Sequence, residues 1–563
     1  MARKFAKESL ERLLIESGRI TRDDLKNALD EQAKTGKRFE EILVKKNKIS
    51  EEEMLEILGG SLGIKHVELE KISIDADIAK SIPYALANKY NLIPLNIKKD
   101  KIVVAMSNPL NLFAIDDVKF ATGYEVEPVI ASKAEIKKQL DKIYIKQSAE
   151  KAAEDLKMEF TGMRKDAADL EDKNAINNAP AVRLVNSIIS QAIKDRASDI
   201  HIEPFEKYVK IRFRIDGELR EVMRVAKNVQ SAVITRIKIM SSLNIAERRI
   251  PQDGRIMLNI DGKDMDVRIS ILPTVFGEKA VMRLLNRTNF LVPKTNLGFS
   301  DDDLKKVESM IKRPYGILLI TGPTGSGKST TMYALINELN TVGRNIVTIE
   351  DPVEYMMEGI NQINVNTKAG LTFASGLRSI LRQDPDVIMI GEIRDNETAE
   401  IAIRAAITGH LVLATLHTND APSSVTRLID MGIQSFLVSS SLIGIIAQRL
   451  VRKICNNCKY EYEANETEKR VLGVDAGEKL MLHRGKGCGI CNHTGYYQRC
   501  GVFEIMEFTR IQRNAIDTGK SLDDLRNISI DAGMKTLFKS CRRLVLSGIT
   551  TIDELLKTTY INE

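Results

Sequence analysis

The feature that most constrains this chain is a glycine-rich segment that follows an apolar run. Residues 318–330 read Leu-Leu-Ile-Thr-Gly-Pro-Thr-Gly-Ser-Gly-Lys-Ser-Thr, which matches the P-loop pattern G-x-x-x-x-G-K-[ST] at every fixed position. The backbone N–H groups of such a loop, and the helix expected after it, point at one concavity that suits phosphate oxygens. The predicted nucleotide-binding residues are Gly322, Pro323, Thr324, Gly325, Ser326, Gly327, Lys328, Ser329 and Thr330.

Two side chains of this loop have specific predicted roles. Lys328 supplies a positive charge for the β- and γ-phosphates of ATP, and the hydroxyl of Ser329 is a ligand for Mg²⁺. The alternative is a glycine-rich turn that occurs by chance. The motif stands between a strand-like run and a helix-like run, residues 331–339, and this context favours the nucleotide site.

Polar groups also follow three further apolar runs, at residues 346–350, 386–390 and 409–416. A parallel α/β sheet brings the carboxyl ends of such strands to one edge, around a ligand. The groups at these ends are Glu354, Glu392 and His417.

The chemistry of ATP hydrolysis assigns a role to each of these groups. Glu392 lies near Mg²⁺, Glu354 orients or deprotonates the attacking water, and His417 senses the γ-phosphate. A standard Walker B strand ends in Asp, and here Gly391 holds that place. The alternative for any single acid is a plain surface charge.

An arginine-rich region of alternating strands precedes the P-loop. Its arginines either lie on solvated strand faces or, for a few of them, reach the phosphates of a neighbouring nucleotide as arginine fingers do. These residues are Arg212, Arg214, Arg255, Arg268 and Arg283.

Two C-x-x-C pairs predict a metal centre after the nucleotide-binding region. Their spacing fits a Cys₄ zinc site, although the gap of 29 residues between the pairs is longer than usual. A redox role is the rival interpretation, and His493 is an alternative ligand. We expect zinc on Cys455, Cys458, Cys488 and Cys491, and reduced thiols at Cys500 and Cys541.

Length and composition indicate a multidomain α/β protein. The chain has 563 residues, which is too long for one domain. Its net charge of +6 is small for this length and only 5% of its residues are aromatic, so the composition does not favour nucleic-acid binding. We find no signal peptide and no apolar stretch of about 18 residues. We therefore expect the protein to lie in the reducing cytosol. The expected divisions are an N-terminal module at 1–145, a linker at 146–176, an arginine-bearing domain at 177–290, an ATPase core at 291–450, a tetracysteine subdomain at 451–505 and C-terminal helices at 506–563.

The N-terminal module opens with an internal repeat over residues 9–58. The two copies align at an offset of 29 residues, and each reads as a helix, a tight turn and a second helix. Thr21 with Asp24 forms an approximate capping box, and Ser50 with Glu53 a full one. The repeat is either a docking bundle or a ligand-sensing module, and an α/β unit follows it.

Taken together, these motifs carry a family resemblance. The P-loop, the acidic box at residues 350–354, the Walker B strand with its glycine and residues 415–419 resemble the secretion-superfamily motor ATPases. The paired C-x-x-C motifs and residues 197–201 (Ala-Ser-Asp-Ile-His) narrow this to the type IV pilus extension ATPases and the similar type II secretion ATPases.

The resemblance implies a RecA-like P-loop core preceded by a PAS-like domain, in a cytoplasmic homohexamer at the inner face of the membrane. It implies contact with an inner-membrane platform protein, and with pilus or secretion accessory proteins. It also implies that Glu354 is the catalytic base, that Glu392 positions Mg²⁺ through water, and that Arg268 and Arg283 contact the phosphates.

The N-terminal repeat resembles a cyclic di-GMP-binding module whose copies open with Arg-Leu-Gly and carry Gly at the turn. Here the copies open with residues 9–11 (Ser-Leu-Glu) and 38–40 (Arg-Phe-Glu), and the second turn has Asn47. These changes weaken guanidinium stacking and close backbone approach.

Competing functions are type II secretion, pilus retraction, a nucleic-acid translocase and a module that holds ATP without hydrolysing it.

Overall fold

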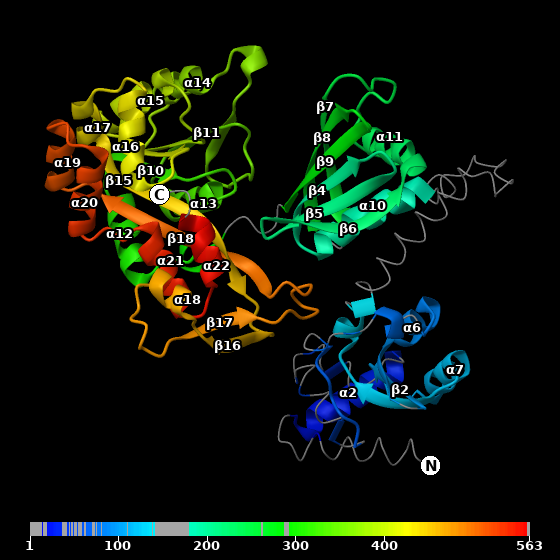
Figure 1. The fold of residues 1–563 in the computed structure, drawn as a ribbon. Coiled ribbons are helices and arrows are strands. Elements are labelled where there is room, and N and C mark those ends of the chain that lie inside the picture. The colour runs from blue at the N-terminus through cyan, green and yellow to red at the C-terminus, as the bar shows by residue number, and fades with distance from the viewer. Residues whose placement is uncertain are drawn as a thin grey trace.

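The computed structural model describes residues 180–260, 263–286 and 292–559, and near the N-terminus residues 20–35, 63–69, 76–79, 81–98, 100–109, 111–137 and 139–140, with single residues between 14 and 74. Figure 1 shows an N-terminal α/β part, a sheet covered by two helices, and a larger α/β part with the C-terminal helices. The predicted linker at 146–176 lies outside the described residues. No described helix is both long and apolar enough to cross a bilayer.

The N-terminal part contains a three-stranded sheet in the order β1-β2-β3. β1 and β2 are antiparallel, and β2 and β3 are parallel. Thr21 and Asp24 exchange side-chain and backbone hydrogen bonds, which confirms the first capping box; Ser50 lies outside the described residues. The elements are α2 (Arg22–Thr35), α5 (Ala76–Ala79), α6 (Tyr84–Tyr90), β1 (Leu92–Lys98), β2 (Lys101–Met106), α7 (Leu112–Thr122) and β3 (Glu125–Ile130).

The second part is an antiparallel sheet of six strands in the order β6-β5-β4-β9-β8-β7. Its strands alternate, so that residues such as Ile200 and Val267 pack in an apolar core with the two helices while the alternate residues lie on the opposite face. The elements are α10 (Pro180–Lys194), β4 (Ala197–Pro204), β5 (Tyr208–Ile215), β6 (Glu218–Ala226), the 3₁₀ helix η2 (Lys227–Val229), α11 (Gln230–Met240), β7 (Gln252–Ile260), β8 (Lys263–Thr274) and β9 (Gly277–Asn286).

The third part is built on a seven-stranded sheet in the order β12-β11-β13-β14-β10-β15-β18. All neighbouring strands are parallel except β15 and β18. Ile317 and Leu319 enter one apolar cluster and Leu318 and Ile320 the other, so β10 is buried on both faces, as a central parallel strand requires. The strands are β10 (Gly316–Thr321), β11 (Ile346–Glu350), β12 (Asn361–Asn364), β13 (Val387–Ile390), β14 (Leu411–Leu416), β15 (Leu442–Ile454) and β18 (Tyr496–Glu507).

Helices cover both faces of this sheet, and several begin with a side-chain cap. Ser300 and Asp303 form a capping box at α12, and Asp420 and Ser423 form one at α16. The elements before β15 are η3 (Lys294–Asn296), α12 (Asp301–Ile311), α13 (Lys328–Leu339), η4 (Thr367–Ala369), α14 (Phe373–Ile380), α15 (Asn396–Ile407), α16 (Ala421–Asp430) and α17 (Ser435–Ser441).

The predicted boundary at residue 450 falls inside β15, and β18 of the tetracysteine segment completes the ATPase sheet. The two segments therefore share one sheet, because the chain leaves it after β15 and returns to it in β18. The elements after β15 are β16 (Lys459–Glu463), α18 (Glu466–Val471), β17 (Met481–Gly485), β18, α19 (Arg510–Asp517), α20 (Leu522–Asp531), α21 (Leu537–Leu546) and α22 (Ile552–Thr559).

Candidate functional site

The glycine-rich loop lies between β10 and α13, as the motif predicts. Gly327 is the N-cap of α13 and has φ 87°, in the left-handed region that glycine favours. A Cβ on Gly322 would lie 2.5 Å from the carbonyl oxygen of Gln448. The two glycines are therefore required by the path of the loop, which turns the first amides of α13 toward the space above β10.

Lys328 closes the loop on itself. Its ammonium donates hydrogen bonds to the carbonyl oxygens of Gly322 (2.8 Å) and Pro323 (3.1 Å). Burial lowers the pKa of Lys328 to about 8, and Glu392 opposes that shift. The side chain thus holds a partly desolvated cation at the loop, while Ser329 stands exposed in the first turn of α13.

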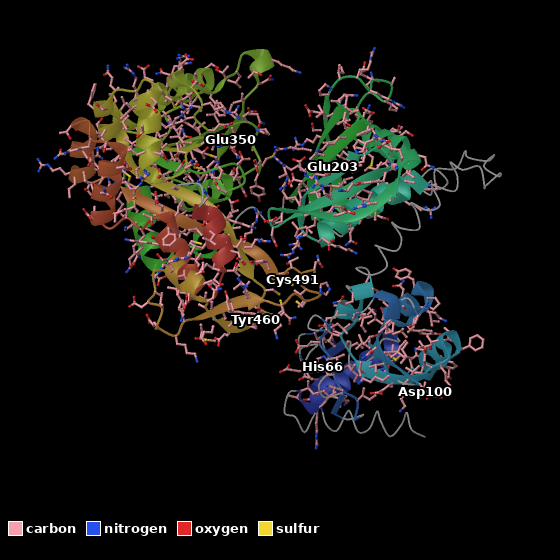
Figure 2. The ribbon with its side chains drawn as sticks, viewed as in Figure 1. His66, Asp100, Glu203, Glu350, Tyr460 and Cys491 are labelled. Carbon is pink, nitrogen blue, oxygen red and sulfur yellow. The ribbon has the colours of Figure 1, made fainter. Side chains whose placement is uncertain are left out.

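Glu354 lies just past the end of β11, over a buried hydrogen-bond network. Tyr333 donates its hydroxyl hydrogen to Glu350 and accepts the backbone N–H of Glu354 (3.2 Å). Glu350 also accepts from Thr348 (2.7 Å) and Gln362 (3.2 Å). Glu350, which Figure 2 labels, is fully engaged in holding the loop, whereas none of these hydrogen bonds uses the carboxylate of Glu354.

Burial raises the pKa of Glu354 above its ordinary value, and the charges of Arg268 and Arg283 oppose that rise. Both arginines belong to the antiparallel domain, so two parts of the chain that are distant in sequence meet electrostatically at this carboxylate. A carboxylate with a raised pKa is a stronger proton acceptor than an ordinary glutamate.

Arg268 and Arg283 are cross-strand neighbours on the face of their sheet that the helices leave uncovered. Arg268 of β8 lies opposite Arg283 of β9 and Arg255 of β7. Arg283 pairs with Asp199 at 3.0 Å and Arg255 with Asp266 at 2.5 Å, whereas no described carboxylate lies within ion-pairing distance of Arg268. Arg268 is therefore the member of this row best placed to receive an incoming anion.

The other two arginines of the predicted set have partners inside their own sheet. Arg212 pairs with Glu203 at 2.7 Å, and Arg214 lies 3.5 Å from Asp199. Figure 2 labels Glu203 within this domain. For Arg212 and Arg214 the structure favours the solvated-face interpretation.

Glu392 and His417 come together at the ends of β13 and β14. His417 Nε2 lies 3.3 Å from Glu392 Oε2, and Arg394 Nη2 lies 2.5 Å from Glu392 Oε1. Glu392 also acts electrostatically on Lys328, which places it beside the P-loop. The sheet therefore gathers the lysine, the acid and the histidine at one edge, as the order of its strands requires.

The glycine at the Walker B position has a steric reason. A Cβ on Gly391 would lie 3.3 Å from the Cα of Glu350 on the neighbouring strand, closer than side chains ordinarily approach a backbone. Gly391 also donates its N–H to the carbonyl of Ile349 (2.8 Å). A side chain at this position would require β11 to give way by a few tenths of an ångström, and Glu392 carries the carboxylate one residue later.

Sequence reasoning missed two residues of β15 that support the P-loop. Gln448 accepts a hydrogen bond from Thr331 (2.8 Å), and buried Arg449 donates to the carbonyl of Asn419 (2.8 Å). Thr418 donates its N–H to Thr321 Oγ1 (3.0 Å), which joins the end of β14 to the end of β10. The available signal was the polar pair that interrupts the apolar run of β15.

The four predicted metal ligands lie in one cluster, of which Figure 2 labels Cys491. Their Sγ atoms all lie within 4.8 Å of one another. The Sγ atoms of Cys455 and Cys488, and those of Cys458 and Cys491, are 3.8 Å apart, and those of Cys488 and Cys491 are 3.7 Å apart.

These distances fit zinc. A tetrahedral ion with Zn–S bonds of about 2.3 Å places neighbouring sulfurs about 3.8 Å apart. Backbone N–H groups of Gly487 and Gly495 point at Cys458 Sγ and Cys491 Sγ, each at 3.3 Å, and donors of this kind stabilise thiolates. The arrangement favours a Cys₄ zinc site over a redox pair and leaves no place in it for His493.

Replacing Cys455 and Cys488 together by Ser is expected to remove about one zinc ion per chain, because two thiolates do not make a structural zinc site. The β16–β17 hairpin then loses its tie to β18, and we expect the protein to lose on the order of 3 kcal/mol of stability. Atomic absorption and thermal melts measure both effects. Cys500→Ala, outside the cluster, is the control and keeps its zinc; a metal-free wild-type protein with a normal melt contradicts the site.

A family model described as "Type II/IV secretion system protein" matches residues 174–557. The chain belongs to the Type II/IV secretion system protein family. It is an ATP hydrolase of that family, which agrees with a complete P-loop and two retained strand-end glutamates.

Relatives of this secretion ATPase cover nearly all of it. It is 44% identical to the type IV pilus assembly ATPase PilB of Myxococcus xanthus, over 97% of this chain and 98% of that protein. It is 43% identical to the type II secretion system protein E of Pseudomonas aeruginosa, over 87% of this chain and 98% of that one. The Legionella pneumophila ATPase DotB matches in fold, with a TM-score of 0.50, 20% identity, and coverage of 67% of this chain and 95% of that one.

A second family model, the MshEN domain, matches residues 62–150. The match begins after the helical repeat and includes the β1-β2-β3 sheet. Residues 9–11, 38–40 and 47, where the repeat departs from the cyclic di-GMP-binding pattern, lie outside the described residues. Cyclic di-GMP binding by the repeat stays a prediction.

Proposed function

We propose that this secretion ATPase is a cytoplasmic hexameric motor that hydrolyses ATP to drive type IV pilus assembly through an inner-membrane platform protein. The observation that carries the proposal is the similarity to the pilus assembly ATPase of Myxococcus xanthus over 97% of one chain and 98% of the other. The match therefore includes the N-terminal module, through which a motor of this kind would receive signals or dock on partners.

A type II secretion motor is the second candidate. The type II secretion protein E of Pseudomonas aeruginosa is almost equally similar, at 43% identity, but it aligns with 87% of this chain. The difference in coverage favours pilus assembly, because the longer alignment accounts for more of the chain. Pilin or secreted protein would be the substrate moved, and neither calls for nucleic acid.

The residues of the site suggest how hydrolysis proceeds. Phosphate oxygens of ATP bind the backbone N–H groups of residues 322–330, other than Pro323, and the Lys328 ammonium. Glu354 accepts a proton from the attacking water, and its raised pKa helps it to do so. His417 reports the state of the γ-phosphate through its contact with Glu392.

The antiparallel domain completes the site with positive charge. Arg268 and Arg283 offset charge that develops on the transferred phosphoryl group, in the manner of arginine fingers. Because these arginines and the P-loop belong to different parts of the chain, loss of the γ-phosphate weakens the attraction between the parts. That change of attraction is a physical route from hydrolysis to movement of the antiparallel domain relative to the P-loop part.

Ser329 and Glu392 would hold Mg²⁺, the former directly and the latter through water. The exposed hydroxyl at the start of α13 and a carboxylate beside Lys328 fit that ion, which prefers oxygen ligands and keeps several waters. Bound Mg²⁺ neutralises phosphate charge. Lys328 and the loop amides then orient the triphosphate against Glu354.

Deleting the gene in its host, then counting surface pili and assaying exported proteins, tests the proposal. Pilus assembly predicts that pili are lost while secretion continues, and that the wild-type gene, but not the Glu354→Gln gene, restores them. The opposite pattern supports the secretion motor. Mass photometry of the purified protein with ATP tests the hexamer, and a monomer under all conditions contradicts a ring.

The partly buried Lys328 makes ATP binding pH-dependent. Burial lowers its pKa to about 8 in the free protein, and bound phosphates raise it again. Binding is therefore at full strength only well below pH 8, and at pH 9 it takes up nearly one proton and is weaker by about tenfold. Calorimetry in two buffers of different ionisation enthalpy measures the uptake. Lys328→Arg stays charged and is expected to abolish it; equal uptake in both proteins contradicts the assignment.

A further inference from the structure

The cysteine cluster lies against the antiparallel domain of the same chain. In Figure 1 the loop that precedes β18 points toward the end of that domain where β5 turns into β6. Asn492, the residue after Cys491, donates its side-chain amide to Asp195 Oδ1 (3.3 Å). The Arg196 guanidinium stacks on the ring of Tyr497, 3.8 Å from its centroid.

Two further contacts extend this surface. The backbone N–H of Gln498 donates to Asp216 Oδ2 (3.2 Å), and Lys557 pairs with Glu218 at 2.7 Å. Gln498 lies where the β15–β18 pairing shifts register and has φ 65°, so its amide leaves the ladder and turns toward Asp216. A non-glycine residue in this conformation is uncommon and here serves the contact.

Residues on both sides of the contact adopt the left-handed backbone conformation. Arg196 and Asp216 on one side, and Asn492 on the other, have φ values of 58°, 50° and 49°. The position of Asn492 is fixed by the cluster itself, because the Cys488 carbonyl accepts the N–H of His493 (2.9 Å) and Cys491 Sγ accepts that of Gly495 (3.3 Å). The cluster therefore orders the loop that the antiparallel domain contacts.

Charge complements this geometry. Four thiolates and one Zn²⁺ carry a formal charge of −2, and the cations that face the cluster from the antiparallel domain are Arg196 and Arg220. Burial and then the charge of Arg452 lower the pKa of Arg220, whereas the charges of Asp216, Glu218 and, least of the three, Cys491 raise it. The remaining neighbours, Glu218 and Asp216, are matched by Lys557 and the Gln498 amide.

We propose that the zinc-loaded loop, residues 488–498, is a docking surface for the α10–β4 and β5–β6 turns of the antiparallel domain of the same chain. The sheet order β6-β5-β4-β9-β8-β7 puts β9, with Arg283, next to β4, and β8, with Arg268, one strand further on. Docking therefore sets where those arginines stand relative to Glu354. That consequence rests on the proposed function, whereas the docking itself does not.

Hydrogen exchange of the full-length, zinc-loaded protein tests the docking without ATP. In Arg220→Ala and in Arg196→Ala we expect zinc to stay at about one per chain, while the amides of residues 216–220 and of Gln498 exchange roughly tenfold faster. Removing zinc from the wild type with a chelator is expected to accelerate the same amides of the antiparallel domain, and not those of β8 and β9.

The matched control is Arg224→Ala, on the same strand as Arg220, because Arg224 pairs with Glu221 within its own domain. Arg224→Ala should leave the hydrogen exchange of Gln498 and of residues 216–220 unchanged. Unchanged protection of Gln498 and residues 216–220 in both variants and in the zinc-stripped protein overturns the proposal. A protein that passes this test but does not hydrolyse ATP leaves the docking intact and rejects the proposed function.

Discussion

Glu354→Gln is expected to lower kcat for ATP hydrolysis by about 10²–10⁴ while leaving ATP affinity within about threefold of the wild type. Gln keeps the size of the side chain but cannot accept a proton from water. The loop is held to Tyr333 through the backbone N–H of Glu354, which the substitution leaves unchanged. The loop therefore keeps its support in the variant. Steady-state hydrolysis and binding of a fluorescent ATP analogue measure the two quantities.

The control for this variant is Glu358→Gln, four residues further on and exposed. It makes the same change of charge without touching the buried network under the loop, and we expect wild-type turnover. Full hydrolysis by the Glu354 variant rejects the assigned base. A loss of ATP affinity equal to the loss of turnover instead points to damage of the P-loop edge.

The sequence predicted the parallel sheet because its strands carry continuous apolar runs that end in chemistry-bearing residues. β10, β11, β13 and β14 occur where those runs stand, and they are parallel neighbours in one sheet. What the pattern did not contain is the return of β18 to that sheet. Tyr496–Glu507 follows a loop-rich cysteine segment, and pairing between distant segments leaves no periodic trace in either one.

The part of the candidate site that could be predicted consists of residues whose type and spacing together indicate their role. A P-loop lysine, strand-end acids and paired cysteines are read from spacing alone. The Tyr333–Glu350 contact was not, because a tyrosine on an apolar helix face is ordinarily core, and only the fold shows which carboxylate lies above it. Spacing also could not show that Arg268 and Arg255 differ in role. Arg255 pairs with Asp266, whereas no described carboxylate pairs with Arg268.

Lys328→Ala is expected to weaken ATP binding by about 100-fold, equivalent to ~3 kcal/mol, because a charge-assisted contact to two phosphates is lost from a partly buried site. In the free protein the ammonium also bonds to the carbonyls of Gly322 and Pro323, so the loop itself relaxes. The rise in melting temperature with added ATP measures binding, and the melting temperature without nucleotide measures damage to the loop.

Lys312→Ala is the matched control, since Lys312 is an exposed lysine at the end of α12 and forms no part of the P-loop. It should show the full ATP-dependent rise. If Lys328→Ala melts like the wild type without nucleotide and still shows that full rise, the loop amides hold the triphosphate without the lysine. The charge of Lys328, and with it the coupling between Lys328 and Glu392, then has no part in binding.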